Sequence, residues 1–182
     1  MKVEEAPIQE IVLSEEAIQQ RVRSLALQVS SDYAENGIHL VAVLKGALVF
    51  LADFSRALTI QATLDFMVVS SYQETRSTGE VRILKDLDYP IADRHVLLVE
   101  DVIDNGVTIQ SLLTTLKLRK PASLKVCTLL DKREKRAAPF QPDYNGFVIS
   151  NQFVVGYGLD YNERYRNLPY IATLRKEVYE HF

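Results

Sequence analysis

The chain has 182 residues, of which 47% are hydrophobic and 25% are charged. This length suits a single domain with a substantial core, and the composition is that of an ordinary globular protein, which excludes extensive disorder. The formal net charge of −3 gives no general attraction to nucleic acids or anionic membranes, so neither is an expected partner.

Helix and strand signals alternate in the N-terminal half. The first ten residues, MKVEEAPIQE, lack the basic and apolar regions of a signal peptide. Ser14 can cap a helix that ends near Gly37. Its buried face is predicted to comprise Ile18, Val22, Leu25, Ala26 and Val29. The next segments are predicted as a strand, a helix and a strand, over residues 38–44, 47–58 and 64–71.

The C-terminal half continues the alternation less regularly. Residues 72–80 are predicted as a long loop, followed by a returning strand in RILKDL. A helix is expected from Thr108 to the break at Pro121. Further strands are predicted at 96–100, 123–130, 146–150, 153–159 and 169–174. Cys127 lies in an apolar run and is expected to be a buried structural thiol, with no disulfide within the chain, which together with the missing signal peptide predicts a cytoplasmic protein.

Apolar strands that alternate with helices predict an α/β fold: a twisted, mostly parallel sheet flanked by helices on both faces. Ligands of such sheets bind beyond the carboxyl ends of the strands. Three segments follow strand ends in this way: Lys45-Gly46, the residues after Val99, and the residues after Leu130. All three carry polar or glycine residues suited to binding.

The segment VEDVIDNGVTIQSL (99–112) combines a strand end, three acids and a helix start. Backbone N–H groups at a helix N-terminus bind anions, and Gly106 allows a close approach. Carboxylates beside such a site bind diols and divalent cations, so Glu100, Asp101 and Asp104 indicate a ribose phosphate with Mg²⁺. A turn whose acids merely cap the helix is the structural alternative.

This segment resembles the phosphoribosyl-pyrophosphate motif of type I phosphoribosyltransferases. The motif consists of four apolar residues, two acids, two apolar residues, Asp, a small polar residue, Gly, any residue and Thr. Residues 96–108 match it except at Asn105, where the family has Thr or Ser. The resemblance implies a type I phosphoribosyltransferase fold, a phosphoribosyl pyrophosphate substrate and Mg²⁺. It assigns the ribose phosphate to Glu100, Asp101, Asp104, Asn105, Gly106, Val107 and Thr108.

Residues 40–174 resemble hypoxanthine-guanine phosphoribosyltransferases more specifically. VLKGA (43–47) is similar to their pyrophosphate loop, which implies a cis Leu44–Lys45 peptide and pyrophosphate binding at Lys45 and Gly46. SSYQETRSTG (70–79) resembles their mobile loop, with Ser71 and Tyr72 as its Ser-Tyr pair. Without the resemblance, these segments would be an ordinary turn and an exposed hairpin loop.

The same resemblance implies a purine site in the C-terminal part. In LLDKREKR (129–136), Lys132 would donate to O6 of the purine, whereas Arg133, Lys135 and Arg136 are expected to be solvated. In FVVGYGLDYNERYR (153–166), the purine-site residues would be Phe153, Val154 and Asp160, and Arg166 would hold pyrophosphate. The implied metal ligands are Glu100, Asp101 and Asp160. The structural alternative for FVVGYGLDYNERYR is a core strand, a glycine bend and a surface ion pair.

The implied reaction transfers a phosphoribosyl group to N9 of a 6-oxopurine, with Asp104 as the base. A single domain spans 1–182, with a core at 14–135 and 168–175. A small hood over the base site comprises 136–167 and the N-terminal segment. The resemblance also implies a homodimer or homotetramer. The alternatives are a related transferase for xanthine, adenine or pyrimidines, a regulator of this fold that binds nucleic acid, and a flavodoxin-like signalling domain.

Overall fold

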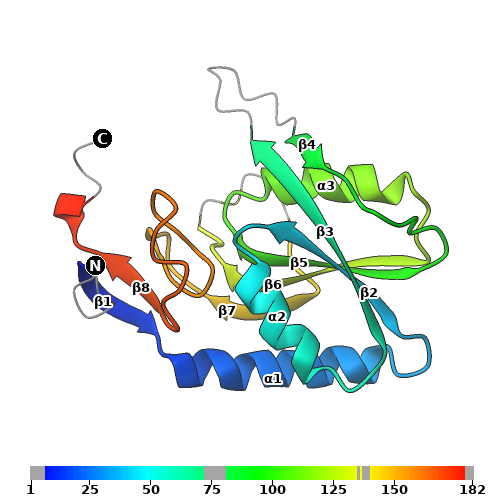
Figure 1. Ribbon diagram of the computed structural model, residues 1–182, viewed down its shortest axis with the longest axis horizontal. Helices are drawn as coiled ribbons and strands as arrows, with labels where there is room; N and C mark the ends of the chain where they lie inside the picture. Colours follow the sequence, from blue (N-terminus) through cyan, green and yellow to red (C-terminus); the bar gives the residue numbers. More distant parts are fainter. Residues whose placement is uncertain (1–6, 72–80, 135, 137–139, 179–182) are drawn as a thin grey trace.

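Apolar strands from the middle of the chain pair in parallel and form the main sheet (Figure 1). The computed structural model describes residues 7–71, 81–134, 136 and 140–178. In that part of the chain, the main sheet has the order β4-β3-β2-β5-β6-β7, with β4 antiparallel at one edge. Its strands are β2 (Ile38–Leu44), β3 (Ala62–Ser71), β4 (Val81–Lys85), β5 (His95–Ile103), β6 (Ser123–Asp131) and β7 (Tyr144–Val148). The predicted α/β fold is therefore confirmed.

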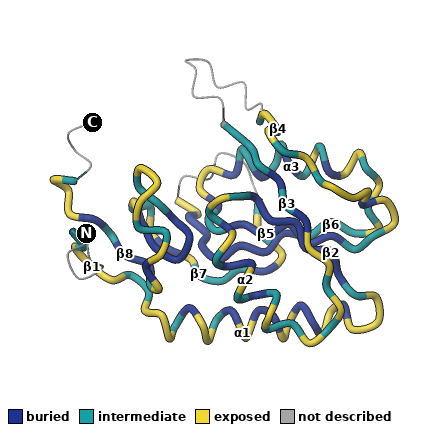
Figure 2. Tube along the Cα trace, in the orientation of Figure 1, coloured by how far each residue is buried: buried dark blue, intermediate teal, exposed yellow. Residues whose placement is uncertain are grey.

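Helices cover both faces of the sheet, as predicted. In Figure 1, α1 (Glu15–Asp32) and α2 (Leu48–Ala57) lie below the sheet, and α3 (Val107–Lys117) lies above it. Side chains alternate along β2 accordingly. Leu40 and Ala42 belong to the cluster that includes α1 and α2, whereas Val41 and Val43 belong to the cluster that includes α3. The buried strands of Figure 2 therefore lie in the middle layer of a three-layer core.

The first long helix forms as its sequence predicts. Ser14 caps α1, because its Oγ accepts a hydrogen bond from the backbone N–H of Ala17 at 3.3 Å. The helix ends at Asp32, several residues before the predicted stop at Gly37, which adopts a positive φ of 64° in the connection to β2. The five predicted apolar positions are all buried. Cys127 is also fully buried, as expected, and burial raises the pKa of its thiol.

The two ends of the chain pair with each other, which the sequence did not predict. β1 (Ile8–Leu13) and β8 (Ile171–Leu174) form a separate antiparallel ribbon, on the left of Figure 1. β1 was missed because its exposed positions give no clear alternation. β8, predicted as part of the core at 168–175, pairs with the N-terminal segment, and its Ile171 packs in the main core cluster. β7, which lies within the predicted hood, extends the main sheet.

The segment between β7 and β8 is irregular, so the predicted strand at 153–159 is wrong. It makes only isolated bridges, such as Val155 with Ala172, because Gly156 and Gly158 bend the backbone at φ values of 98° and 101°. A short 3-10 helix, Lys176–Val178, follows β8. No helix in the described part of the chain is long and apolar enough to cross a membrane.

Candidate active site

The sheet has a switch point between β2 and β5. From β2 the chain continues to β3 on one side, and from β5 it continues to β6 on the other. At such a point the loops after the two strands diverge and leave a crevice at the carboxyl ends, where ligands bind in open α/β sheets. The loops after Leu44 and Ile103 border this crevice, and both were singled out from the sequence.

The loop between β5 and α3 has the form of an anion site. Gly106 is the N-cap of α3 with a φ of 83°, and no side chain caps the helix from that position. Asn105 lies one residue earlier, and its Oδ1 accepts from the backbone N–H of Val107 at 3.0 Å. A cavity of about 180 Å³ adjoins the loop, and its lining includes Glu100, Asp104, Asn105, Gly106 and Thr108. The backbone N–H groups of the first turn of α3 can donate to a phosphate here. One of them, the N–H of Val107, donates to the side chain of Asn105, which a phosphate would have to displace.

Glu100 and Asp101 are successive residues of β5, so their side chains point to opposite faces of the sheet. Glu100 lines the cavity beside α3, and burial followed by the charge of Asp101 raises its pKa well above the ordinary range. Burial is also the main cause that raises the pKa of Asp101 to about 6. Buried acids without full compensation create a site that favours a cation.

Asp101 faces the loop that follows β2. A Cβ added to Gly46 would lie 1.7 Å from Oδ2 of Asp101, so only glycine fits between the strand end and this carboxylate. The preceding Leu44–Lys45 peptide bond is cis, as expected. A Cβ on Gly158 would lie 2.2 Å from the backbone oxygen of Gly46. Two glycines thus allow the loop after β2 to pack directly on the loop before β8.

Acidic and basic side chains meet across these two loops. Arg166 pairs with Asp160 at 2.7 Å and donates to the carbonyl oxygen of Gly158 at 2.8 Å. Lys45 pairs with Glu163 at 3.0 Å, and this bond is the main cause that lowers the pKa of Glu163. The charges of Arg166 and Asp160 act on Asp101 as well. The structure therefore brings together Lys45, Gly46 and Arg166, expected to bind pyrophosphate, with Asp101 and Asp160, two of the three expected metal ligands.

Mg²⁺ fits this set of acids only as a partly hydrated ion. In the described part of the chain, no three His, Cys, Asp or Glu side chains are grouped closely enough to hold a metal alone. Mg²⁺ commonly uses one or two carboxylates, with waters and substrate phosphates as its other ligands. Asp101 and Asp160 could supply such carboxylates, since the charge of Asp160 contributes to the raised pKa of Asp101. Glu100 points to the other face and is less suited to the same ion.

The predicted purine residues lie beside the phosphate loop. Lys132 directly follows β6, and its backbone N–H donates to the carbonyl oxygen of Ile103 at 2.9 Å. Its side chain is buried, with Nζ 3.9 Å from Oδ2 of Asp104. Phe153 is 45% exposed and packs edge-on against the ring of Tyr161, with centroids 5.8 Å apart. The next residue, Val154, is buried.

A buried acid beside Lys132 was missed in the sequence. Asp131 is 1% exposed, accepts from Nε of Arg133 at 2.7 Å and forms an ion pair with Arg136. Arg136 is largely buried, so the prediction that it is solvated is wrong; Lys135 lies outside the described residues. A Cβ on Gly106 would lie 3.0 Å from Cδ of Arg136. The side chain of Arg136 therefore lies against Gly106 and connects the purine side of the site to the phosphate loop.

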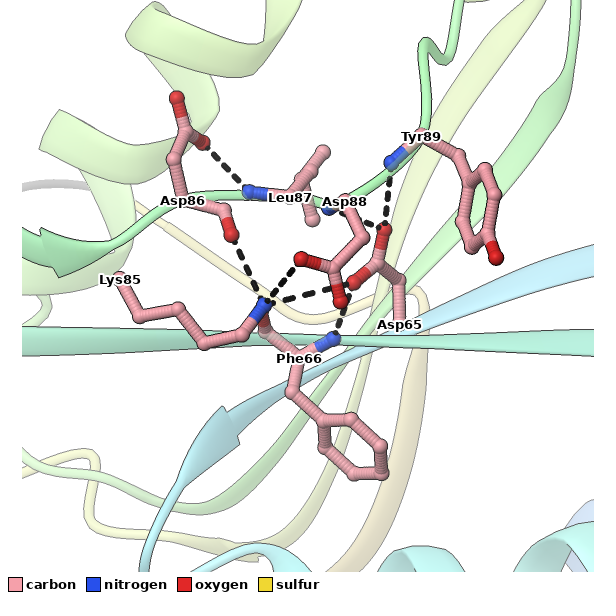
Figure 3. A network of polar contacts seen from close by, with 7 residues as sticks. All are labelled: Asp65, Phe66, Lys85, Asp86, Leu87, Asp88 and Tyr89. Carbon is pink, nitrogen blue, oxygen red and sulfur yellow. Dashed lines mark hydrogen bonds and ion pairs between the residues drawn. The ribbon is translucent and has the colours of Figure 1, made fainter.

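The base of the β3–β4 hairpin is held by a second buried acid that the sequence did not reveal (Figure 3). Oδ2 of Asp65 accepts from the backbone N–H groups of Asp88 and Tyr89, at 2.9 and 3.2 Å. Lys85 lies 3.9 Å from Asp65 and 3.1 Å from Asp88. Of the expected Ser-Tyr pair, Ser71 ends β3, while Tyr72 and the rest of that loop lie outside the described residues.

A comparison with protein-family models identifies the family of this chain. The family model described as "Phosphoribosyl transferase domain" matches residues 9–162. The chain belongs to the phosphoribosyl transferase family. The predicted type I phosphoribosyltransferase fold and enzyme class are therefore confirmed.

Similar proteins narrow the family. The chain is 47% identical over 174 residues to a hypoxanthine-guanine phosphoribosyltransferase of Bacillus subtilis, covering 95% of this chain and 97% of that one. It is 44% identical to a hypoxanthine-guanine-xanthine phosphoribosyltransferase of Tritrichomonas foetus, covering 94% of each. A crystal structure of a hypoxanthine phosphoribosyltransferase from Staphylococcus aureus superposes with a TM-score of 0.92, at 45% identity and 95% coverage of both chains.

Proposed function

We propose that this phosphoribosyltransferase transfers the 5-phosphoribosyl group of phosphoribosyl pyrophosphate to N9 of hypoxanthine and guanine, in purine salvage. The observation that carries the proposal is the position of Lys132, a buried lysine tied to the end of β5 beside the phosphate loop. The phosphate loop and Lys132 together suit a nucleotide, which joins a sugar phosphate to a base that forms hydrogen bonds. The similarity to the Bacillus subtilis enzyme over nearly the whole chain supports the same substrates.

Lys132 gives the site its selectivity for a 6-oxopurine. An ammonium group only donates hydrogen bonds, so it favours the O6 of hypoxanthine or guanine and disfavours the 6-amino group of adenine. Phe153 would stack on the purine, and the backbone carbonyl of Val154 would meet its Watson–Crick edge. The edge-on contact between Phe153 and Tyr161 supports this role, since it leaves ring area of Phe153 exposed.

Asp104 is proposed as the general base. The purine must lose its N7 proton as N9 attacks the anomeric carbon, and a carboxylate near the imidazole edge can accept it. Asp104 projects from the phosphate loop with a side chain that is 53% exposed and 3.9 Å from Lys132.

Glu100 and Asp101 would hold the ribose hydroxyls and stabilise the positive charge that develops on the sugar. The helix start at 105–108 would bind the 5-phosphate, and Lys45 with Arg166 would neutralise the departing pyrophosphate. Asp101 and Asp160 are the proposed carboxylates for Mg²⁺, with Glu100 in a secondary role. When bound, Mg²⁺ supplies charge neutralisation at the phosphate oxygens of the donor.

A nucleobase panel tests the substrate proposal. The protein is incubated with Mg²⁺, phosphoribosyl pyrophosphate and one base at a time, and the nucleotide and released pyrophosphate are measured. Inosine and guanosine monophosphates are expected. Nucleotide formation from adenine or uracil alone would contradict the role of Lys132. The matched control is the variant Lys132→Gln, which should lose activity with hypoxanthine.

Xanthine is a second candidate base, because a relative with 44% identity is a hypoxanthine-guanine-xanthine phosphoribosyltransferase. Xanthine shares the 6-oxo group and differs at position 2, which Lys132 does not contact in the proposed orientation. The same panel measures its kcat/KM against that of guanine. A kcat/KM for xanthine within about tenfold of that for guanine would add xanthine to the substrates. A tenfold ratio corresponds to a difference of roughly 1.4 kcal/mol in activation free energy between the two bases.

We also propose a cytoplasmic homodimer or homotetramer. The free, buried thiol of Cys127 is compatible with a reducing compartment and motivates the first part. The second part is motivated by a structural relative that is 42% identical, the hypoxanthine phosphoribosyl transferase of Trypanosoma cruzi, whose structure was determined to study its oligomeric state. Light scattering coupled to size exclusion gives the mass directly, and a monomer at enzyme concentrations used in assays would refute the proposal.

A further inference from the structure

Glu163 occupies a position between the two cations proposed for pyrophosphate. Its Oε2 lies 3.0 Å from Nζ of Lys45, and its Oε1 lies 3.4 Å from Nη2 of Arg166. Lys45 comes from the loop after β2, 118 residues away in the chain. One carboxylate thus bridges cations from the two loops, as a diphosphate would.

The backbone at Glu163 shows that this side chain is placed against local preference. Tyr161 and Arg164 exchange backbone hydrogen bonds at 3.2 and 3.0 Å and enclose a two-residue turn. Both central residues of the turn, Asn162 and Glu163, have positive φ values, 49° and 61°. Such turns favour Asn followed by Gly, so Asn162 fits its position and a glutamate replaces the preferred glycine. A disfavoured residue in a site loop points to a role for its side chain.

The ion pairs of Glu163 are weak enough to be displaced. The side chains of Lys45 and Glu163 are 66% and 64% exposed, so water screens their attraction. Arg166 keeps other partners, since it also binds Asp160 and the carbonyl oxygen of Gly158. An entering anion of higher charge can therefore take the place of the carboxylate without leaving Arg166 unsupported.

We propose that Glu163 is an internal competitor for the pyrophosphate subsite, and this inference rests on the proposed function. Its carboxylate bridges Lys45 and Arg166 while the subsite is empty, and the donor or pyrophosphate displaces it. After transfer, the return of the carboxylate to Lys45 and Arg166 promotes release of pyrophosphate. Glu163 thereby determines how strongly the enzyme binds pyrophosphate, separately from its binding of the nucleotide.

Two variants test this role by removing the carboxylate in different ways. Glu163→Gln keeps the size of the side chain, whereas Glu163→Gly supplies the residue that the turn prefers. Binding of pyrophosphate in the presence of Mg²⁺ is measured by titration calorimetry, with inosine monophosphate as the comparison ligand. Both variants should bind pyrophosphate roughly fivefold more tightly and inosine monophosphate as the wild type does, since an exposed ion pair is lost as a competitor. Glu35→Gln, an exposed acid before β2, is the control for net charge.

The other outcomes overturn the inference. Weaker or unchanged binding of pyrophosphate by Glu163→Gln would show that the carboxylate positions the cations or does nothing. Tighter binding by Glu163→Gly alone would assign the effect to turn flexibility, and an equal effect of Glu35→Gln would assign it to net charge. Nucleotide formation by the wild type tests the proposed function separately. If the wild type forms no nucleotide, the proposed function fails. If the wild type forms nucleotide but both variants bind pyrophosphate as the wild type does, only the proposed role of Glu163 fails.

Discussion

Replacing Asp101 by Asn should stabilise the metal-free protein at neutral and alkaline pH. The cause is the buried position of this carboxyl, whose pKa is raised from an ordinary 3.8 to about 6. Asparagine keeps the shape and the acceptor that binds the N–H of Val102 at 2.7 Å, but it carries no charge. The folded state then no longer holds a desolvated anion.

The sign and the size follow from the shift. A raised folded-state pKa means that the folded protein loses stability as the pH rises through the range from 3.8 to about 6. The full effect is about 3 kcal/mol, at roughly 1.4 kcal/mol for each pH unit. Asp101→Asn should therefore raise the free energy of unfolding by up to about 3 kcal/mol at pH 8, and by about half of that at pH 5.

Urea unfolding in the presence of a chelator measures this difference at both pH values. Glu35→Gln removes an exposed carboxylate in the connection between α1 and β2 and should change stability little. Equal or lower stability of Asp101→Asn at pH 8 would refute the reasoning, because it would show that Arg166 fully compensates the buried charge. Activity should fall in the stabilised variant, as is common where a site holds uncompensated charge.

Three further substitutions test other parts of the site. Asp104→Asn should lower kcat by roughly 100-fold or more and leave the KM for phosphoribosyl pyrophosphate nearly unchanged, as steady-state kinetics would show; an unaltered kcat removes Asp104 from the role of base. Gly158→Ala should lower the free energy of unfolding by about 1–3 kcal/mol, since its Cβ would lie 2.2 Å from the oxygen of Gly46; wild-type stability in urea would contradict this contact. Asp65→Ala should lower the free energy of unfolding by about 1–3 kcal/mol, because the backbone N–H groups of Asp88 and Tyr89 lose the carboxylate that accepts from them, while Lys85 keeps its pairing with Asp88; an unchanged thermal unfolding curve would contradict this role.

Elements with strong local signals were predictable from the sequence. β2 matches its predicted bounds, and Ser14 caps α1 as expected, because buried apolar runs and caps act within a few residues. β5 runs to Ile103, three residues beyond its predicted end at Glu100, since Val102 and Ile103 continue the pairing with β6. Local composition could not reveal that the strand continues past the acid at position 101.

Features that depend on distant partners were not predictable. β1 is recognisable as a strand only through its pairing with β8, more than 150 residues later. Arg136 looks like part of a solvated charge run, yet it is buried against Asp131. Glu163 gave no signal, since neither its turn conformation nor its bridge to Lys45 follows from neighbouring residues.

The binding mode of the nucleotide tests the assignment of the phosphate loop and of Lys132. A crystal structure of the protein with inosine monophosphate should show the phosphate hydrogen-bonded to backbone N–H groups of residues 105–108, with the side chain of Asn105 withdrawn from Val107 and O6 of the purine next to Lys132. A phosphate bound away from that helix start, or a base that does not reach Lys132, would contradict the account of this site.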